Sequence, residues 1–227
     1  MDKNCSIYEL EMLRAMGFRF IGNDQLTKAK RVEFDSLNSL NSQIKSCNLC
    51  QLCKSRNKAV VGSGNLDNGI VFIFESPDIK SDQSGVCTQT ASLAKYLQMA
   101  DIDSSKLYFT YILKCINKTT DPRYIEICSK FFELELRIIS PKFIVSFGEN
   151  CFNYLAKSSS FDSHRGGIYR LKNSLYLPTF DSNWIDKNPS KASEFITDLK
   201  KLKDIYEKFD YSFFDNLYDF YSIKCTK

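Results

Sequence analysis

Residues 143–156 read FIVSFGENCFNYLA and contain the unit on which the expected fold is built. An apolar, β-rich run over Phe143–Phe147 is followed by Gly148, and a helix pattern then covers Glu149–Ala156. Glycine accepts backbone angles that other residues resist, so Gly148 suits a tight turn between the two elements. The stretch therefore predicts a strand, a turn and a helix in direct succession.

Three more runs of the same kind occur elsewhere in the chain. Residues 70–74, 107–113 and 175–180 are short, apolar and β-rich, and helix patterns cover residues 90–99 and 121–139 between them. Strands that alternate with helices are typical of a parallel sheet covered on both faces. The pattern thus predicts an α/β fold.

The same elements suggest how the chain is divided. Residues 34–207 hold the strand and helix patterns and are expected to form one domain, with helix starts at Asp121-Pro122 and Asn188-Pro189. Residues 1–33 are expected to form a helical extension. Residues 208–227, dense in Phe and Tyr, are expected to form a C-terminal helix that packs on the domain or docks a partner.

Composition excludes several classes of protein. Hydrophobic residues make up 43% of the 227 residues and charged residues 26%, which is enough to build a core. No apolar run approaches the ~20 residues that a membrane span needs, and the N-terminus lacks the apolar region of a signal peptide. The chain is therefore expected to be cytoplasmic and to have no membrane partner. The net charge of +4 alone does not predict nucleic-acid binding.

The cysteines carry the most specific local signal. Cys47 and Cys50 form a C-x2-C pair, a spacing that lets two thiolates share one metal centre, and Cys53 follows. A zinc ribbon would need a second C-x2-C pair, but the sequence offers Cys115 and Cys128, with twelve residues between them. Four well-spread thiols of this kind favour a cubane iron–sulfur cluster over zinc. The alternatives are ordinary buried cysteines and, for Cys53, a neighbour or a substitute ligand.

The chain resembles the iron–sulfur (family 4) branch of the uracil-DNA glycosylase superfamily over roughly residues 38–205. The resemblance rests on motifs that occur in the family's order and near its spacing: Cys47-x2-Cys50-x-Leu52-x3-Arg56, Val60-Val61-Gly62-Ser63-Gly64-Asn65, Tyr108…Lys114-Cys115, Glu126-x-Cys128, Arg165-Gly166 and Leu177-Pro178-Thr179-Phe180.

The resemblance implies a fold, a cofactor and a partner. The fold is a three-layer α/β/α sandwich with a central four-stranded parallel sheet, and DNA lies across the carboxyl ends of its strands. A 4Fe–4S cluster is held by four cysteines, and basic and glycine residues contact single- or double-stranded DNA. The ligands are Cys47, Cys50, Cys115 and Cys128, and the DNA contacts are Arg56, Lys114, Arg165 and Gly166.

The motif that ends the first strand is altered. Glu75, Pro77 and Asp82 are retained, and either carboxylate is a candidate for orienting a water molecule. Phe74 and Asp78 replace the family's flanking glycines, so side chains occupy positions where backbone would approach a ligand. Thr88 stands where an aromatic ring would stack on the base.

Two further contacts with the base are replaced. Tyr111 occupies the position of an asparagine that reads the uracil edge, and a phenol lacks the paired donor and acceptor of an amide. Asp181 stands where a histidine would stabilise the departing uracil anion, and an ionised carboxylate would repel that anion. The pocket lined by Pro77, Thr88 and Tyr111 is therefore not expected to support ordinary uracil excision.

Three functions are compatible with this sequence. The first is a DNA glycosylase of altered specificity in base-excision repair, in which Glu75, Asp82 and Asp181 are the catalytic candidates. The second is a catalytically inactive nucleic-acid-binding module, and the third is a protein-interaction module that docks through residues 208–227. The sequence favours a monomeric, glycosylase-like protein that acts on or binds DNA.

Overall fold

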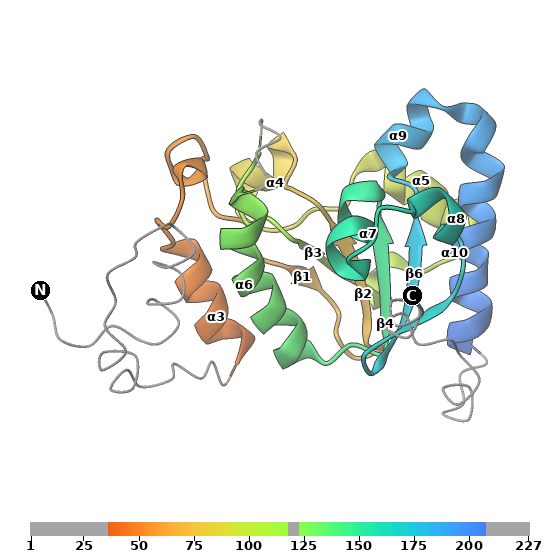
Figure 1. Ribbon diagram of the computed structural model, residues 1–227, viewed down its shortest axis with the longest axis horizontal. Coiled ribbons are helices and arrows are strands. Elements are labelled where there is room, and N and C mark those ends of the chain that lie inside the picture. The colour runs from red at the N-terminus through yellow and green to blue at the C-terminus, as the bar shows by residue number, and fades with distance from the viewer. Residues whose placement is uncertain (1–35, 118–122, 208–227) are drawn as a thin grey trace, which may run out of the picture. The chain divides into compact units, whose positions relative to one another are not determined.

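A computed structural model describes residues 36–117 and 123–207 of the chain (Figure 1). The predicted helical extension at residues 1–33, the helix start at Asp121-Pro122 and the aromatic segment at residues 208–227 lie outside the described residues. None of the helices within those two ranges is both long and apolar enough to cross a membrane.

The chain forms two compact units, each assembled from separate stretches. The first unit takes in residues 36–61, 76–86, 112–117 and 123–138 of the described chain, and the second takes in residues 62–75, 87–111 and 139–207. The predicted cluster ligands all fall in the first unit, whereas the whole sheet falls in the second.

The sheet of the second unit has the order β1-β3-β2-β4-β6-β5 among the described residues. Its four central strands are mutually parallel, which confirms the predicted parallel sheet. Two short antiparallel strands, β1 and β5, extend it at the edges and were not predicted. The strands are β1 (Ser63–Gly64), β2 (Ile70–Phe74), β3 (Tyr108–Tyr111), β4 (Phe143–Phe147), β5 (Tyr169–Leu171) and β6 (Ser174–Thr179).

The order of the parallel strands reverses between β2 and β4. The chain steps from β2 to β3 on one side, then crosses to β4 on the other side of β2, and continues to β6. In open α/β sheets, ligand sites form at the carboxyl ends of the two strands that flank such a reversal. Glu75 directly follows β2 and Gly148 directly follows β4, so both residues lie at this position.

Helices cover both faces of the sheet. On one face Phe143 and Phe147 of β4 contact Tyr206 and Phe195 of α10 (Ala192–Glu207), and Phe195 also contacts Tyr96 of α5 (Ala91–Met99). On the other face α7 (Glu149–Ala156) packs on β4, as Figure 1 shows. The second unit also contains η2 (Ser104–Lys106), α8 (Phe161–His164), α9 (Ser182–Lys187) and η3 (Pro189–Lys191).

The first unit has its own apolar core. It consists of α3 (Leu37–Lys45), η1 (Gln51–Lys54), α4 (Ile79–Ser84) and most of α6 (Arg123–Ile139). Leu40 and Ile44 of α3 pack with Ile127 and Phe131 of α6, and Cys47 and Cys50 lie against this cluster. The core therefore places the C-x2-C pair beside the helix that carries Cys128.

Gly148 provides a test of the turn that ends β4. Its φ of 88° and ψ of 163° fall in a region that is open almost only to glycine. We expect Gly148→Ala to reduce the free energy of unfolding by about 1–3 kcal/mol, because the alanine Cβ strains this conformation. Urea unfolding monitored by circular dichroism measures the change, and an alanine variant as stable as the wild type would contradict it.

Candidate functional site

The four predicted cluster ligands come together within the first unit. Cys47 follows α3, Cys50 precedes η1, Cys115 follows the end of β3, and Cys128 lies inside α6. Cys115 and Cys128 are buried, with 2% and 4% of their surface exposed, whereas Cys47 and Cys50 are half-buried. The thiol of Cys128 is within electrostatic range of the other three.

These thiols hold their protons more tightly than free cysteine does. Burial raises the pKa of all four, that of Cys115 to about 11, and the charges of neighbouring thiolates raise the pKa further. Thiolates are the ligands that iron–sulfur clusters use, so the donor set fits a cluster of this type.

No group of three or more His, Cys, Asp or Glu side chains in the described residues is placed to hold a metal ion, so ligation of a cluster by the four cysteines stays a prediction. Cys53 lies beside the set: its N–H donates to the Cys50 carbonyl at 3.2 Å, and its thiol is an electrostatic neighbour of Cys47 and Cys50.

Arg56 contacts the cysteine set, although the resemblance implied a contact with DNA. One terminal nitrogen of its guanidinium donates to Cys115 Sγ at 2.9 Å, and the other donates to the Cys47 carbonyl at 2.6 Å. The side chain thus joins two stretches of the chain that each carry a predicted ligand.

Lys114, another expected DNA contact, is buried. Only 2% of its side chain is exposed, and its Nζ lies 2.5 Å from Glu135 Oε2, which is itself fully buried. The ion pair links the segment that carries Cys115 to α6, and a contact of Lys114 with DNA stays a prediction.

Arg165 and Gly166 form a structural junction with α10. The Arg165 guanidinium donates to Asp198 at 2.7 Å and to Glu194 at 2.6 Å, so two carboxylates balance its charge. A Cβ on Gly166 would lie 2.3 Å from Asp198 Oδ1, which explains the glycine. These contacts engage the predicted DNA-binding arginine within the second unit and leave its contact with DNA a prediction.

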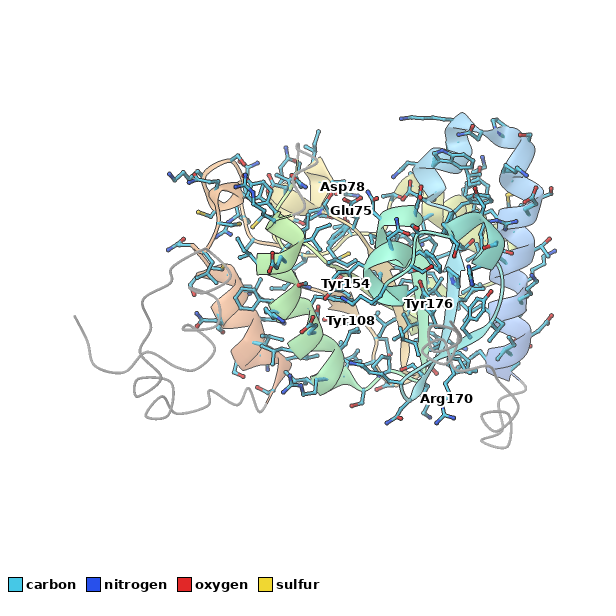
Figure 2. The ribbon with its side chains drawn as sticks, in the orientation of Figure 1. Glu75, Asp78, Tyr108, Tyr154, Arg170 and Tyr176 are labelled. Atoms are coloured by element: carbon cyan, nitrogen blue, oxygen red, sulfur yellow. The ribbon has the colours of Figure 1, made fainter. Side chains whose placement is uncertain are left out.

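Glu75 is anchored by a residue of the helix that follows Gly148. Asn150 lies in the first turn of α7, and its Nδ2 donates to Glu75 Oε2 at 2.8 Å. The amino end of a helix carries a partial positive charge, which favours a carboxylate there. Glu75 is thereby fixed at the carboxyl end of β2, where Figure 2 labels it. Within the described chain, its second oxygen, Oε1, accepts no hydrogen bond.

Asp181 lies close to the same turn. It caps α9, and one carboxylate oxygen accepts hydrogen bonds from the N–H groups of Asn183 and Trp184 at 2.9 and 3.0 Å. A Cβ on Gly148 would be 3.6 Å from Asp181 Cβ, so the two residues are neighbours. Burial raises the pKa of Asp181, although the two N–H donors and Lys187 oppose that rise.

Cys151 connects the two carboxylates. It is fully buried in α7, and burial together with the charges of Glu75 and Asp181 raises the pKa of its thiol. Both carboxylates must therefore lie near this thiol. The structure thus brings Glu75 and Asp181 together beside the amino end of α7.

Asp82, the third predicted catalytic carboxylate, has a different environment. It belongs to the first unit, is 3% exposed, and accepts the Asn57 N–H at 3.1 Å and Asn57 Nδ2 at 2.6 Å. Its carboxylate fixes the segment after η1. These contacts are structural, and a catalytic role for Asp82 stays a prediction.

The predicted base-pocket residues are distributed over both units. Tyr111 is only 4% exposed, and its ring packs at 5.8 Å against Phe74, which stacks on Phe147 at 4.7 Å. The Phe74 ring therefore packs against one ring from each neighbouring strand, β3 and β4. Thr88 is half-buried in the second unit and Pro77 is buried in the first, so a pocket formed by Pro77, Thr88 and Tyr111 stays a prediction.

The sequence also matches known proteins. Residues 61–208, more than half of the chain, match the family described as the uracil DNA glycosylase superfamily. The chain belongs to the uracil-DNA glycosylase superfamily. The family 4 branch predicted from the sequence is confirmed by relatives that carry the name type-4 uracil-DNA glycosylase.

Two of these relatives cover most of the chain. The Thermotoga maritima type-4 uracil-DNA glycosylase is 29% identical over 180 residues, which make up 74% of this chain and 94% of the relative. The Archaeoglobus fulgidus type-4 enzyme is 26% identical over 200 residues, which make up 81% of this chain and all of the relative. The match confirms the predicted α/β sandwich of a uracil-DNA glycosylase.

Three residues of this uracil-DNA glycosylase homologue were not identified from its sequence. Asn150 anchors Glu75, Glu135 pairs with Lys114, and Asn57 binds Asp82. Only Glu135 carried a usable signal, since it lies on the same stripe of α6 as the buried Cys128 and Phe131. Asn150 and Asn57 follow turns, where polar residues are common, so their partners became visible only in three dimensions.

The buried ion pair beside the cysteine set can be tested by removing one partner. We expect Lys114→Met to reduce the free energy of unfolding by about 3–5 kcal/mol, because the buried Glu135 would lose the ammonium that is paired with it. Lys114→Met combined with Glu135→Leu should recover most of the loss. Urea unfolding at matched iron content measures both changes, and a single variant as stable as the double variant would contradict the expectation.

Proposed function

We propose that this chain is an iron–sulfur DNA glycosylase of altered base specificity that acts in base-excision repair. One observation carries the proposal. Glu75 and Asp181 lie beside the amino end of α7, where the strand order reverses, and each has one oxygen anchored by N–H donors. Their other oxygens accept no hydrogen bond from the described residues and are available to a substrate and a water molecule.

The chemistry follows from the two environments. Hydrolysis breaks the bond between the base and C1′ of the sugar, adds the water hydroxyl to C1′ and leaves a proton on the base. Glu75, oriented by the Asn150 hydrogen bond at the amino end of α7, takes the water proton, stabilises positive charge on the sugar and later releases the proton to solvent. Asp181, whose pKa is raised by burial, gives its proton to the departing base and is reprotonated from solvent.

The altered residues argue against uracil as the preferred base. Uracil leaves as an anion, which neutral or positive donors stabilise and an ionised carboxylate repels. Tyr111 is buried against Phe74 and offers no amide to the uracil edge. A protonated Asp181 instead suits a base that must be protonated before it leaves. The proposed substrate is therefore DNA with a damaged or modified base of that kind.

The cofactor, partner and compartment belong to the same proposal. Cys47, Cys50, Cys115 and Cys128 would hold a 4Fe–4S cluster, which in this role orders the first unit rather than reacting with the base. DNA is the proposed partner, in single- or double-stranded form, and the chain acts as a cytoplasmic monomer. The type-4 names of the relatives support DNA as the substrate class.

Base release provides the direct test. We expect the full chain to release a modified base from single-stranded or duplex oligonucleotides, and to release uracil more slowly. Glu75→Gln should lower the rate by about 10²–10⁴-fold, because glutamine keeps the hydrogen bond from Asn150 but cannot accept a proton. Single-turnover assays on oligonucleotides carrying uracil, hypoxanthine or an alkylated purine measure the rates.

The matched control is Glu149→Gln, which removes an exposed carboxylate from the same turn of α7. It should leave base release unchanged. If iron-loaded protein released none of these bases yet bound DNA, the catalytic proposal would fail, and a nucleic-acid-binding role would replace it.

Asp181 gives the site a defined pH dependence. The acid form is needed to protonate the base, so the rate of base release should fall as pH rises through the raised pKa of Asp181. Asp181→Asn keeps the cap of α9 but cannot donate a proton, so it should be slow at every pH. Rates measured from acid to neutral pH provide the test.

Two further variants sharpen this experiment. Asp162→Asn removes an exposed carboxylate elsewhere and should keep the wild-type pH profile. Asp181→His restores the residue expected in the family motif and should shift the preference toward uracil. A wild-type profile that rises with pH over the same range would contradict the assignment of Asp181 as the acid.

A further inference from the structure

Arg56 holds together two parts of the cysteine set. Its guanidinium donates to Cys115 Sγ at 2.9 Å and to the Cys47 carbonyl at 2.6 Å. Cys47 belongs to the loop after α3, whereas Cys115 follows the distant strand β3. The two hydrogen bonds therefore fix two predicted ligands relative to each other within the first unit.

The geometry requires arginine rather than any positive charge. The guanidinium is planar and presents several N–H donors in a fixed fork, so one side chain can bind a sulfur atom and a carbonyl at once. A lysine offers a single ammonium on a flexible stem and cannot hold both partners in the same geometry. Arg56 is half-buried, which limits competition from water.

A second N–H···S contact supports the buried half of the set. The backbone N–H of Lys114 donates to Cys128 Sγ at 3.2 Å, and the Lys114 carbonyl accepts the Val60 N–H at 2.7 Å. The segment that carries Arg56 is thereby also joined, through Val60, to the segment that carries Cys115. Both buried sulfur atoms receive an N–H donor.

We propose that Arg56 is a positioning residue for the iron–sulfur site: it orients Cys115 toward the Cys47 loop and balances thiolate charge. This inference rests on the cluster that we propose above. A cubane bound by four thiolates carries net negative charge, and a guanidinium hydrogen-bonded to one sulfur offsets part of that charge. The fixed geometry keeps Cys115 in place when an iron–sulfur bond opens, so the cluster is lost more slowly.

The same contact predicts an effect on reduction. Hydrogen bonds to the sulfur atoms set the potential of iron–sulfur clusters, because they stabilise the more negative, reduced form. Removing the donor and its charge should lower the equilibrium constant for one-electron reduction by about tenfold, which corresponds to about 59 mV. A role in DNA binding alone would leave this constant unchanged.

The experiment compares full-length wild type with Arg56→Gln and Arg56→Lys, all purified without oxygen. Lys54→Gln is the matched control, because Lys54 is an exposed cation two positions away in the same segment. Iron and sulfide per chain are measured first, and the visible absorbance is then followed in ferricyanide and a chelator. We expect cluster loss at least tenfold faster in Arg56→Gln, an intermediate rate in Arg56→Lys, and the wild-type rate in Lys54→Gln.

Circular dichroism shows whether each variant has the wild-type helix content. Arg56→Lys keeps the positive charge but not the planar fork, so its rate of cluster loss is a second test of the inference. Equal cluster lifetimes and potentials in all four proteins would overturn the inference. If Arg56→Gln instead lowered DNA affinity and reduced the salt slope by about one, Arg56 would be a phosphate contact. Wild-type protein without iron and sulfide would overturn the cluster proposal itself, whereas iron-loaded wild type with unaffected variants would overturn only the role of Arg56.

Discussion

The hydrogen bond from the Gly148 N–H to the Thr179 carbonyl, 2.8 Å long, joins the carboxyl ends of β4 and β6. It holds the turn in a conformation that only glycine adopts easily, and α7 begins directly afterwards. Because α7 starts at this point, Asn150 reaches Glu75 at the end of β2. Asp181, two residues beyond Thr179, lies beside the same turn.

Because of this constraint, the ends of sheet strands position the site, and not loops that move separately. Three neighbouring strands end at a common edge, and one backbone hydrogen bond fixes the spacing of two of them. A carboxylate from each outer connection is then placed beside the amino end of one helix. The third candidate carboxylate, Asp82, already accepts hydrogen bonds from the backbone N–H and the side-chain amide of Asn57.

Much of this arrangement could be predicted from the sequence, and the reasons are physical. The four central strands were predicted because buried parallel strands are short apolar runs. The assignment of Cys47, Cys50, Cys115 and Cys128 as ligands stays a prediction, and the structure places all four in the first unit. β1 and β5 were missed because runs of two and three residues carry no periodic signal. The contacts of Arg56 and Lys114 within the first unit could not be predicted, because a basic residue gives the same sequence signal on the surface and in a buried pair. Only the contacts with Cys115 and Glu135 distinguish the two cases.

Because the first unit is assembled from separate stretches of the chain, its cysteines are synthesised at different times. Cys47 and Cys50 leave the ribosome early, whereas the helix that carries Cys128 follows only after β2 and β3 have been made. Chains grow at about 5–20 residues per second, so the early thiols wait several seconds for their partners. The nascent chain must therefore carry reactive thiols past cellular oxidants and stray metal ions. The proposed iron–sulfur cluster could be completed only on a chain that has already emerged through α6.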